Sequence, residues 1–238
     1  GEVLGRPRHE YTRRLLAAVP SAASRGQRLS ASPPTTADAA PPVPAGAPPF
    51  AEVRDLTVHF PLPDGGRRRA VDGVSFAVPR GGTVGIVGES GSGKSTVARV
   101  GMGLLRPDAG EVVFDGEPWS AVPERVRRPH RGRIQLISQD PLSSFDPRFT
   151  VERIIGQALR LHRPGEERRG ETVRLLGLVG LGADVLGRRP AELSGGQRQR
   201  VAIARALGTG PELLVCDEAV SSLDVSSQAR VLDVLGDL

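Results

Sequence analysis

The feature that most constrains this chain is a glycine-rich stretch that runs into its only lysine and two hydroxyl residues. It reads Gly88-Glu89-Ser90-Gly91-Ser92-Gly93-Lys94-Ser95-Thr96, which fits the pattern G-x-x-x-x-G-K-[ST] of a phosphate-binding P-loop. The glycines let backbone N–H groups curl around phosphate oxygens without a Cβ in the way. The Lys94 ammonium can reach the β- and γ-phosphates, and the Ser95 hydroxyl can ligate Mg²⁺.

A P-loop needs a strand before it and a helix after it. The apolar segment Thr83–Val87 predicts a buried strand, and residues 95–102 predict a helix that starts near Lys94. The positive end of that helix dipole adds to the attraction for phosphate. With both flanks present, the sequence predicts a nucleotide site and not a chance glycine-rich turn.

The bulk composition narrows the class of protein. A chain of 238 residues is long enough for one large domain with a tail. The net charge of +5 comes from arginines scattered among acids, so we expect a solvated surface and no nucleic-acid partner. A single cysteine, Cys216, excludes an intrachain disulfide and fits a reducing cytosolic setting. The sequence has neither a secretory signal nor an apolar run of about 18 residues, so no transmembrane helix is expected.

The order of apolar segments indicates an α/β domain preceded by a linker. Residues 20–49 are rich in Pro, Ala, Ser and Thr, which predicts a disordered linker, and residues 11–19 before it predict a short amphipathic helix. Beyond Phe50, strands and helices alternate, as in α/β domains with a helical subdomain. We expect strands at 53–60, 70–78, 111–114, 134–138 and 213–216, a mostly helical insert at 150–186, and a helix at 225–235.

A second motif, an apolar strand followed by two acidic residues, is the one that a P-loop site requires. A P-loop site takes another carboxylate for Mg²⁺ from the end of a neighbouring apolar strand, and the run Leu213–Cys216 is followed by Asp217 and Glu218. Asp217 is placed to hold Mg²⁺ directly or through water. Glu218 is placed to accept a proton from an attacking water.

A third motif is a capped helix start, Leu193-Ser194-Gly195-Gly196-Gln197-Arg198-Gln199-Arg200. A Ser cap and two glycines make it a second anion-binding device, and one phosphate chain hardly needs two from one subunit. The stretch closely resembles the signature motif of ATP-binding cassette (ABC) ATPases, whose loop closes over the γ-phosphate bound to the opposite cassette. The resemblance implies a second cassette, fused or separate, as partner. It also implies a P-loop fold with a RecA-like parallel-sheet core, an N-terminal antiparallel β-subdomain and a helical subdomain at about 145–205.

The same resemblance suggests roles for further residues. Gln139 resembles the Q-loop glutamine, which senses Mg²⁺ and the lytic water and couples to the membrane partner. Residues 221–224, ending in Asp224, resemble the D-loop that crosses the dimer interface. Phe60 is the candidate for stacking on adenine, with His59 as the alternative, although a core strand residue is nearly as good an interpretation of Phe60.

The expected site residues fall into three groups. They are Lys94, Gln139 and Glu218 for catalysis; Gly88, Glu89, Ser90, Gly91, Ser92, Gly93, Lys94, Ser95, Thr96, Phe60, Ser194, Gly195, Gly196 and Asp224 around ATP; and Ser95, Gln139 and Asp217 at Mg²⁺.

Two longer stretches narrow the resemblance from ABC ATPases in general to one family of importers. Residues 139–148 and 217–226 are similar to those of the oligopeptide, dipeptide and nickel importer ATPases. That family implies ATP hydrolysis that powers uptake of peptides or related solutes. It further implies transmembrane permease subunits, an indirect substrate-binding protein, and a peripheral location on the cytoplasmic face of the membrane.

Residues 9–20 resemble the C-terminal tail of the same importer family. This predicts a tandem fusion, in which residues 1–19 end a preceding cassette, residues 20–49 link, and residues 50–238 form an ABC domain. The family's switch histidine follows the D-loop, yet all four histidines lie upstream of Glu218, so we expect a fragment of a longer protein. Two alternatives stay open: a soluble ABC ATPase acting on ribosomes or DNA, and a cassette that binds ATP without hydrolysing it. The short interval between Lys94 and Ser194, without sustained heptads, disfavours the DNA-repair members.

Overall fold

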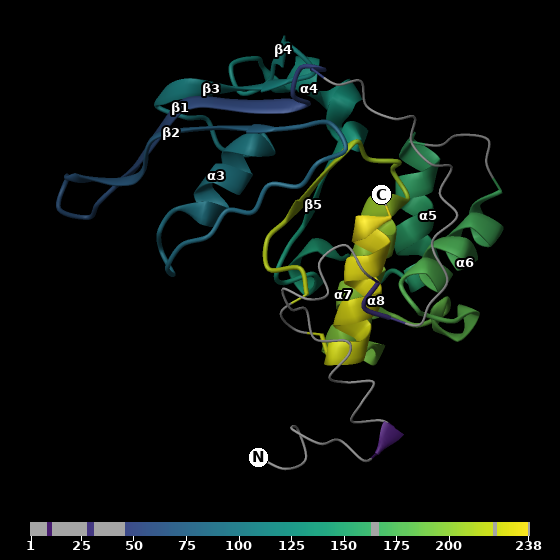
Figure 1. The fold of residues 1–238 in the computed structure, drawn as a ribbon. Helices are drawn as coiled ribbons and strands as arrows, with labels where there is room; N and C mark the ends of the chain where they lie inside the picture. The colour runs from purple at the N-terminus through teal and green to yellow at the C-terminus, as the bar shows by residue number, and fades with distance from the viewer. Residues whose placement is uncertain (1–8, 11–27, 31–45, 163–166, 221–222, 238) are drawn as a thin grey trace. The chain divides into compact units, whose positions relative to one another are not determined.

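The structure, a computed structural model, describes residues 9–10, 28–30, 46–162, 167–220 and 223–237 (Figure 1). It divides into two compact units, one of residues 41–136 and the other of residues 1–40 together with 137–238. The predicted helix at 11–19 and most of the predicted linker at 20–49 lie outside the described residues.

The unit of residues 41–136 is built on a four-stranded antiparallel sheet in the order β2-β1-β3-β4 (Figure 1). A turn at residues 63–66 joins the first two strands, whose register runs from Ala51 opposite Val78 to Pro61 opposite Arg67. This is the predicted antiparallel subdomain. Its strands are β1 Ala51–Pro61, β2 Arg67–Val78, β3 Ala109–Phe114 and β4 Glu117–Pro118.

The helix predicted after the P-loop is present as α3, Lys94–Gly101, which buries Val97 and Val100 and contacts β2. Two short elements, α4 Glu124–Arg127 and a 3₁₀ helix at Arg128–Arg133, complete this unit.

The strand predicted at Thr83–Val87 is wrong. The segment has no regular structure, and Val87 is 97% exposed. None of the described strands is hydrogen-bonded to it. A strand of this apolar type forms when neighbours pair with its edges and cover its faces, so a high β-propensity alone does not produce it.

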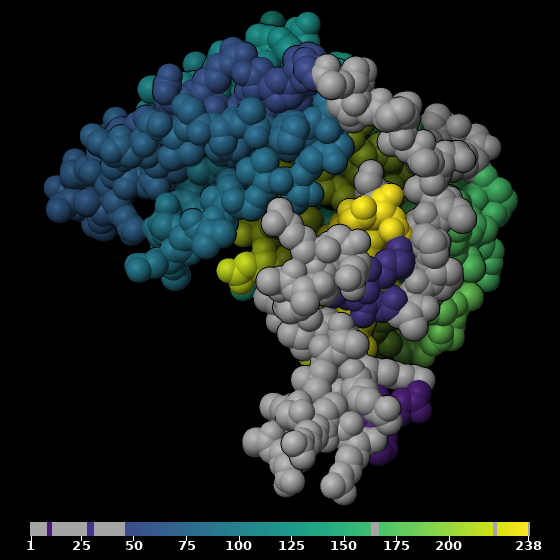
Figure 2. Space-filling model, viewed as in Figure 1, coloured from purple at the N-terminus to yellow at the C-terminus, as the bar shows by residue number. Residues whose placement is uncertain are grey.

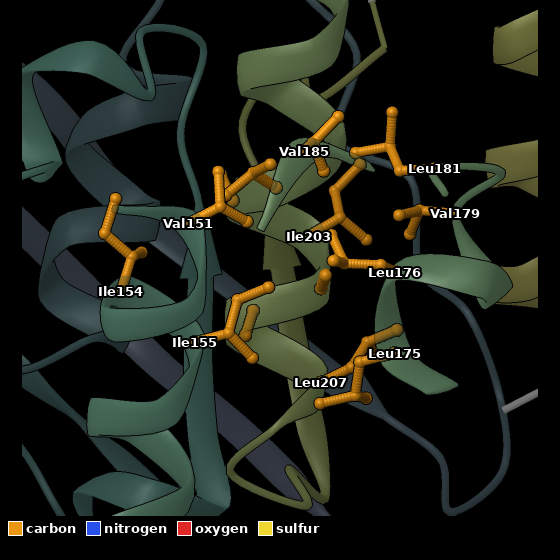
Figure 3. Packing of buried hydrophobic residues seen from close by; sticks show 14 of the residues in the cluster. Val151, Ile154, Ile155, Leu175, Leu176, Val179, Leu181, Val185, Ile203 and Leu207 are labelled. Carbon is orange, nitrogen blue, oxygen red and sulfur yellow. The ribbon is translucent and has the colours of Figure 1, made fainter. Parts of the chain in front are cut away.

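The helical part of the second unit packs around one apolar cluster, which confirms the predicted helical insert. Along α5 the buried residues Val151, Ile154, Ile155 and Leu159 follow helical spacing and form one face. Figure 3 shows Ile155 directed toward Leu175 of α6 and Leu207 of α7, and α5, α6 and α7 contact each other. Among the described residues no helix is both long and apolar enough to span a bilayer. The helices are α5 Val151–His162, α6 Arg168–Leu178, α7 Gly195–Leu207 and α8 Val225–Gly236.

The strands β5 Ile134–Ile137 and β6 Leu213–Cys216 form a second sheet, as predicted. The Asp217 N–H, just after β6, donates to the Ile137 carbonyl at 3.0 Å. The carboxyl ends of both strands therefore lie together, which is the arrangement of a parallel pair. The α/β fold class is confirmed, although β6 is only partly buried and its last residue, Cys216, is exposed.

Three residues of the predicted linker are ordered against α8. Backbone N–H groups of Leu29 and Ser30 donate to the Asp233 carboxylate at 2.8 Å each, and the Ser30 hydroxyl donates to it at 2.6 Å. Arg28 binds Asp237 one turn further along. Figure 2 shows this indigo segment directly beside the yellow surface of α8. The structure thus places Arg28–Ser30 against α8, and the prediction of a disordered linker at residues 20–49 stays a prediction for the rest of that range.

Candidate functional site

The side chain of Lys94 hydrogen-bonds to the backbone of the P-loop itself. Lys94 is the first residue of α3, and its Nζ donates to the carbonyls of Gly88 and Glu89, both at 2.8 Å. These two bonds hold the ammonium over the residues that the motif assigns to phosphate. The first N–H groups of α3 have no partner inside the helix, so the loop ends on a positive helix terminus.

Gly93 shows why the motif needs glycine at this position. Its φ is +96°, in the left-handed region, and a Cβ there would lie 2.3 Å from the Ala70 carbonyl oxygen on β2. A side chain would therefore force the loop away from the sheet.

The P-loop lies beside a hollow of about 390 Å³. Phe60 on β1 is 37% exposed and lines the hollow together with Lys94 and Ser95, whereas the His59 N–H and ring bind Asp108. Of the two sequence candidates for contacting adenine, Phe60 is thus the one beside the P-loop. The full lining is Phe60, Leu62, Arg68, Ala70, Gly91, Gly93, Lys94, Ser95 and Thr96.

Sequence reasoning missed Arg68 at this hollow. Its guanidinium donates to the Gly91 carbonyl at 3.5 Å, at the edge of hydrogen-bonding distance. The run of arginines at 67–69, directly after the turn that precedes β2, was the available signal, but a run of charges usually indicates a solvated face.

In the second unit the structure brings Gln139 and Glu218 together. The Gln139 amide donates from Nε2 to Glu218 Oε2 at 2.8 Å. Glu218 follows Asp217 at the end of β6 and has φ +51°, a left-handed conformation that a residue with a side chain rarely adopts. Such strain costs about 1–3 kcal/mol and is concentrated at functional positions. The predicted Q-loop residue and the predicted water-activating residue therefore form one group.

The capped helix start predicted at residues 193–200 is formed. Ser194 is the N-cap of α7, its Oγ accepts from the Gln197 N–H at 3.2 Å, and Gln197 Oε1 accepts from the Ser194 N–H at 2.9 Å. This is a complete capping box. Ser194 and Gly195 are exposed, so this helix terminus is accessible to a ligand or another chain.

Asp224 caps the next helix. Its Oδ1 accepts from the Ser227 N–H at 3.0 Å at the start of α8, and hydrogen bonds from the Ser227 side chain and backbone hold the pKa of Asp224 below its usual value. Ser221 and Ser222 lie outside the described residues, so the role of this segment between cassettes stays a prediction.

Gln199 is a residue that sequence reasoning did not single out. It lies on α7, is 0% exposed, and its Nε2 donates to the Ser138 carbonyl at 3.1 Å. The signal was its spacing, because Gln199 precedes the buried Ile203 and Ala206 by four and seven residues and so shares their core-facing side.

The residues present fit ATP and Mg²⁺. The glycine loop leaves a cradle that a Cβ at Gly93 would close, and Lys94 supplies the cation for phosphate. Each unit by itself offers oxygen atoms of the type that Mg²⁺ takes: the Ser95 hydroxyl in one unit, and the Asp217 carboxylate and Gln139 amide in the other.

Comparison with known proteins agrees with these features. The profile described as ABC transporter matches residues 71–221. The chain is 44% identical over 196 residues to the oligopeptide transport ATP-binding protein AppF of Bacillus subtilis, covering 79% of this chain and 60% of AppF. It is 41% identical over 256 residues to the glutathione import ATP-binding protein GsiA of Pectobacterium atrosepticum, covering 100% of this chain and 41% of GsiA. The chain thus spans between about two fifths and three fifths of the length of these relatives.

Solved structures agree as well. A dimeric, post-hydrolysis state of the ATP-binding cassette MJ0796 bound to ADP and Pi is similar with a TM-score of 0.72 and 28% identity, over 78% of this chain and 81% of that one. The structure of cbiO1 from Clostridium perfringens, part of the transporter complex cbiONQ, is similar with a TM-score of 0.65 and 26% identity, over 80% of this chain and 73% of that one. With the family profile covering more than half of its length, this chain belongs to the ABC transporter family.

Proposed function

We propose that this chain binds and hydrolyses ATP to power the uptake of peptides, or related small solutes, across the cytoplasmic membrane. The observation that carries the proposal is the hydrogen bond between Gln139 and Glu218, next to Asp217 at the end of β6. It holds a carboxylate in a fixed orientation directly after the residue expected to bind Mg²⁺. The peptide class rests on the names of the relatives, an oligopeptide transport protein and a glutathione import protein.

The P-loop would bind the triphosphate. Backbone N–H groups of residues 88–96 and the Lys94 ammonium bind the phosphate oxygens, and Phe60 stacks on adenine from the edge of the hollow. Ser95, Asp217 and Gln139 are the residues that we propose as ligands of Mg²⁺, which would supply further neutralisation of charge on the phosphates. The Lys94 ammonium also neutralises negative charge at the γ-phosphate, where this charge develops during transfer.

Glu218 would activate the water. The water oxygen attacks the γ-phosphorus, the bond from that phosphorus to the bridging oxygen of ADP breaks, and Glu218 takes the proton from the water. The Gln139 amide holds the Glu218 carboxylate in place for this transfer. The left-handed backbone conformation of Glu218 sets the direction of its Cα–Cβ bond.

A second cassette would complete each site. Ser194, Gly195 and Gly196 at the exposed start of α7 are placed to bind the γ-phosphate held by an opposite cassette. The dimeric state of the similar cassette MJ0796 supports this arrangement. Permease subunits in the membrane, and through them a substrate-binding protein, are the other partners that we propose, and they place the chain on the cytoplasmic face of the membrane.

We also propose that residues 50–238 form the cassette, that residues 20–49 link it to a preceding one, and that residues 1–19 are the tail of that preceding cassette. The alignment to GsiA, which extends over the whole of this chain, supports this division.

The transport proposal is tested with the complete natural protein and its membrane subunits in proteoliposomes. We expect ATP-dependent uptake of labelled di- to pentapeptides, and we expect Glu218→Gln to stop uptake while ATP still binds. ATP hydrolysis that is stimulated by ribosomes or DNA, with no peptide uptake, would instead support the soluble alternative.

A further inference from the structure

We propose that Gln199 is a positioning residue that holds the main chain before Gln139 and thereby sets the geometry of the Gln139–Glu218 pair. The inference rests on the proposed function of that pair. It concerns a side chain on α7 that is 0% exposed.

Two hydrogen bonds connect α7 to the proposed catalytic group. Gln199 Nε2 donates to the Ser138 carbonyl at 3.1 Å, and the next residue, Gln139, donates to Glu218 Oε2 at 2.8 Å. The peptide group between Ser138 and Gln139 is therefore fixed from α7. Because a peptide group is planar, fixing its carbonyl also limits the direction in which Gln139 can point.

Simple core packing does not explain a glutamine at this position. The Gln199 side chain is 0% exposed, and among the described residues its Oε1 has no hydrogen-bond partner. Leaving a buried acceptor unsatisfied is unfavourable. Methionine or leucine would fill the same space without that cost, so the feature that distinguishes glutamine here is the donor to Ser138.

The Ser138 end of the contact is also ordered. The Ser138 hydroxyl donates to the Asp140 carbonyl at 3.1 Å, and the Asp140 carboxylate accepts from the Leu142 N–H at 3.0 Å. Gln139 is thus bracketed by a fixed residue on each side. Its side chain is exposed, so without these bonds it would sample several rotamers.

The helix that carries Gln199 begins at the proposed signature residues. Ser194 caps α7, and Gln199 lies on the second turn of the same helix. One rigid element therefore holds both the residues that would meet the opposite cassette and the residue that orients Gln139. Closure of two cassettes at the start of α7 would therefore also affect the orientation of the Glu218 carboxylate, because the same helix holds Gln199.

The test uses the complete natural protein with Gln199→Met, which keeps the side-chain volume and removes the donor. Thr172→Val is the matched control, because Thr172 is also 0% exposed but its hydroxyl, within the part of the chain that the structure describes, donates to the Arg168 carbonyl of its own helix α6. We expect Gln199→Met to lower kcat by between about 10- and 100-fold with the KM for ATP within about twofold, since misplacement of a reacting group lowers the rate of the chemical step. Thr172→Val should leave both values near those of the wild type.

Hydrogen–deuterium exchange gives a readout that does not depend on activity. Gln199→Met should speed exchange in the peptide that covers residues 138–144, and Thr172→Val should not. Gln199→Asn provides a second variant, because its amide is one methylene shorter and no longer reaches the Ser138 carbonyl. The same kcat loss and faster exchange are expected.

Wild-type kcat and unchanged exchange in folded Gln199→Met or Gln199→Asn would overturn the inference while leaving the proposed function intact. Absence of ATP hydrolysis in the wild type itself would overturn the proposed function, and with it the assignment of a catalytic geometry to be positioned.

Discussion

Gly93 and Glu218 both adopt left-handed backbone conformations, but for different reasons. Gly93 does so because the P-loop passes so close to β2 that a Cβ would meet the Ala70 carbonyl. Glu218 does so while carrying a long charged side chain, at the end of a strand and in contact with Gln139. The first is a steric requirement of the fold, whereas the second is backbone strain at a residue that we propose to be catalytic.

Gly93→Ala tests the steric requirement. We expect at least a tenfold loss of ATP affinity and a loss of about 1–3 kcal/mol in the free energy of unfolding, because the loop must move away from β2 and the left-handed φ becomes strained. Titration with a fluorescent ATP analogue and urea denaturation measure the two effects. Gly85→Ala is the control, since no described atom outside its two chain neighbours lies within 4 Å of the ideal Cβ position of Gly85, and its φ is not left-handed. Equal affinity in both variants would contradict the expectation.

At the residue scale, the residues that could be predicted from the sequence are those that belong to a short local motif. The P-loop, the cap of α7 and the acids after β6 are short patterns with a physical reason for each residue type. The structure has the predicted helix after the P-loop, the predicted Ser194 cap and the predicted strand before Asp217, whereas the ligand roles of these residues stay predictions. Gln199 was not predictable in this way, because its partner is a backbone carbonyl 61 residues away. The position of Arg68 beside the P-loop was not predictable either, because nothing in the sequence distinguishes Arg68 from Arg67 and Arg69.

At the scale of elements, periodicity predicted helices better than strands. The helix α8 and the strands β1 to β3 formed close to the expected boundaries, and α5 and α6 lie within the predicted helical insert, where each buries one face in a common cluster. The exception, Thr83–Val87, has the apolar composition of a central strand but no partner strand among the described residues. Composition indicates that a segment would suit a sheet, whereas pairing decides whether it joins one.

Ile155 tests the helical cluster. It is fully buried on α5 and faces the side chains of α6 and α7 (Figure 3). Ile155→Ala should lower the free energy of unfolding by about 2–5 kcal/mol, because it removes buried methylenes and leaves a cavity. Val173→Ala, at a more exposed position of α6, should change it by less than about 0.5 kcal/mol. Urea denaturation followed by circular dichroism measures both, and similar losses for the two variants would count against this packing.

Asp233 tests the docking of Arg28–Ser30 on α8. Burial acts to raise the pKa of Asp233, but hydrogen bonds from Ser30 and Leu29, together with the charge of Arg28, outweigh it and lower the pKa below its usual value. A carboxyl group with a lowered pKa in the folded state stabilises the fold above its unfolded pKa, about 3.9, and this stabilisation is lost as the pH falls. The wild type should therefore be more stable than Asp233→Asn at pH 7, and the difference should shrink below about pH 4.

Melting temperatures of both proteins between pH 7 and pH 3 measure this difference. A difference that does not depend on pH would show that the charge of Asp233 does not hold the segment.

At the scale of the whole molecule, the proposed phosphate-binding residues and the proposed water-activating residues belong to different units of the chain. The P-loop and Phe60 lie in residues 41–136, whereas Gln139, Asp217, Glu218 and the signature residues lie in the other unit. Binding of ATP alone tests the first group, and only hydrolysis tests both. The family profile spans the two units, from residue 71 to residue 221, so the division lies within one ABC cassette.

The measurement that tests this account most directly is phosphate release from ATP by the complete natural protein, comparing wild type, Lys94→Ala and Glu218→Gln. Lys94→Ala should lose ATP affinity, because the only lysine of the P-loop is removed. Glu218→Gln should bind ATP like the wild type yet release phosphate at least about 100-fold more slowly, in keeping with the loss of a general base. Phosphate release by Glu218→Gln at the wild-type rate would contradict the central claim that Glu218, held by Gln139, activates the water.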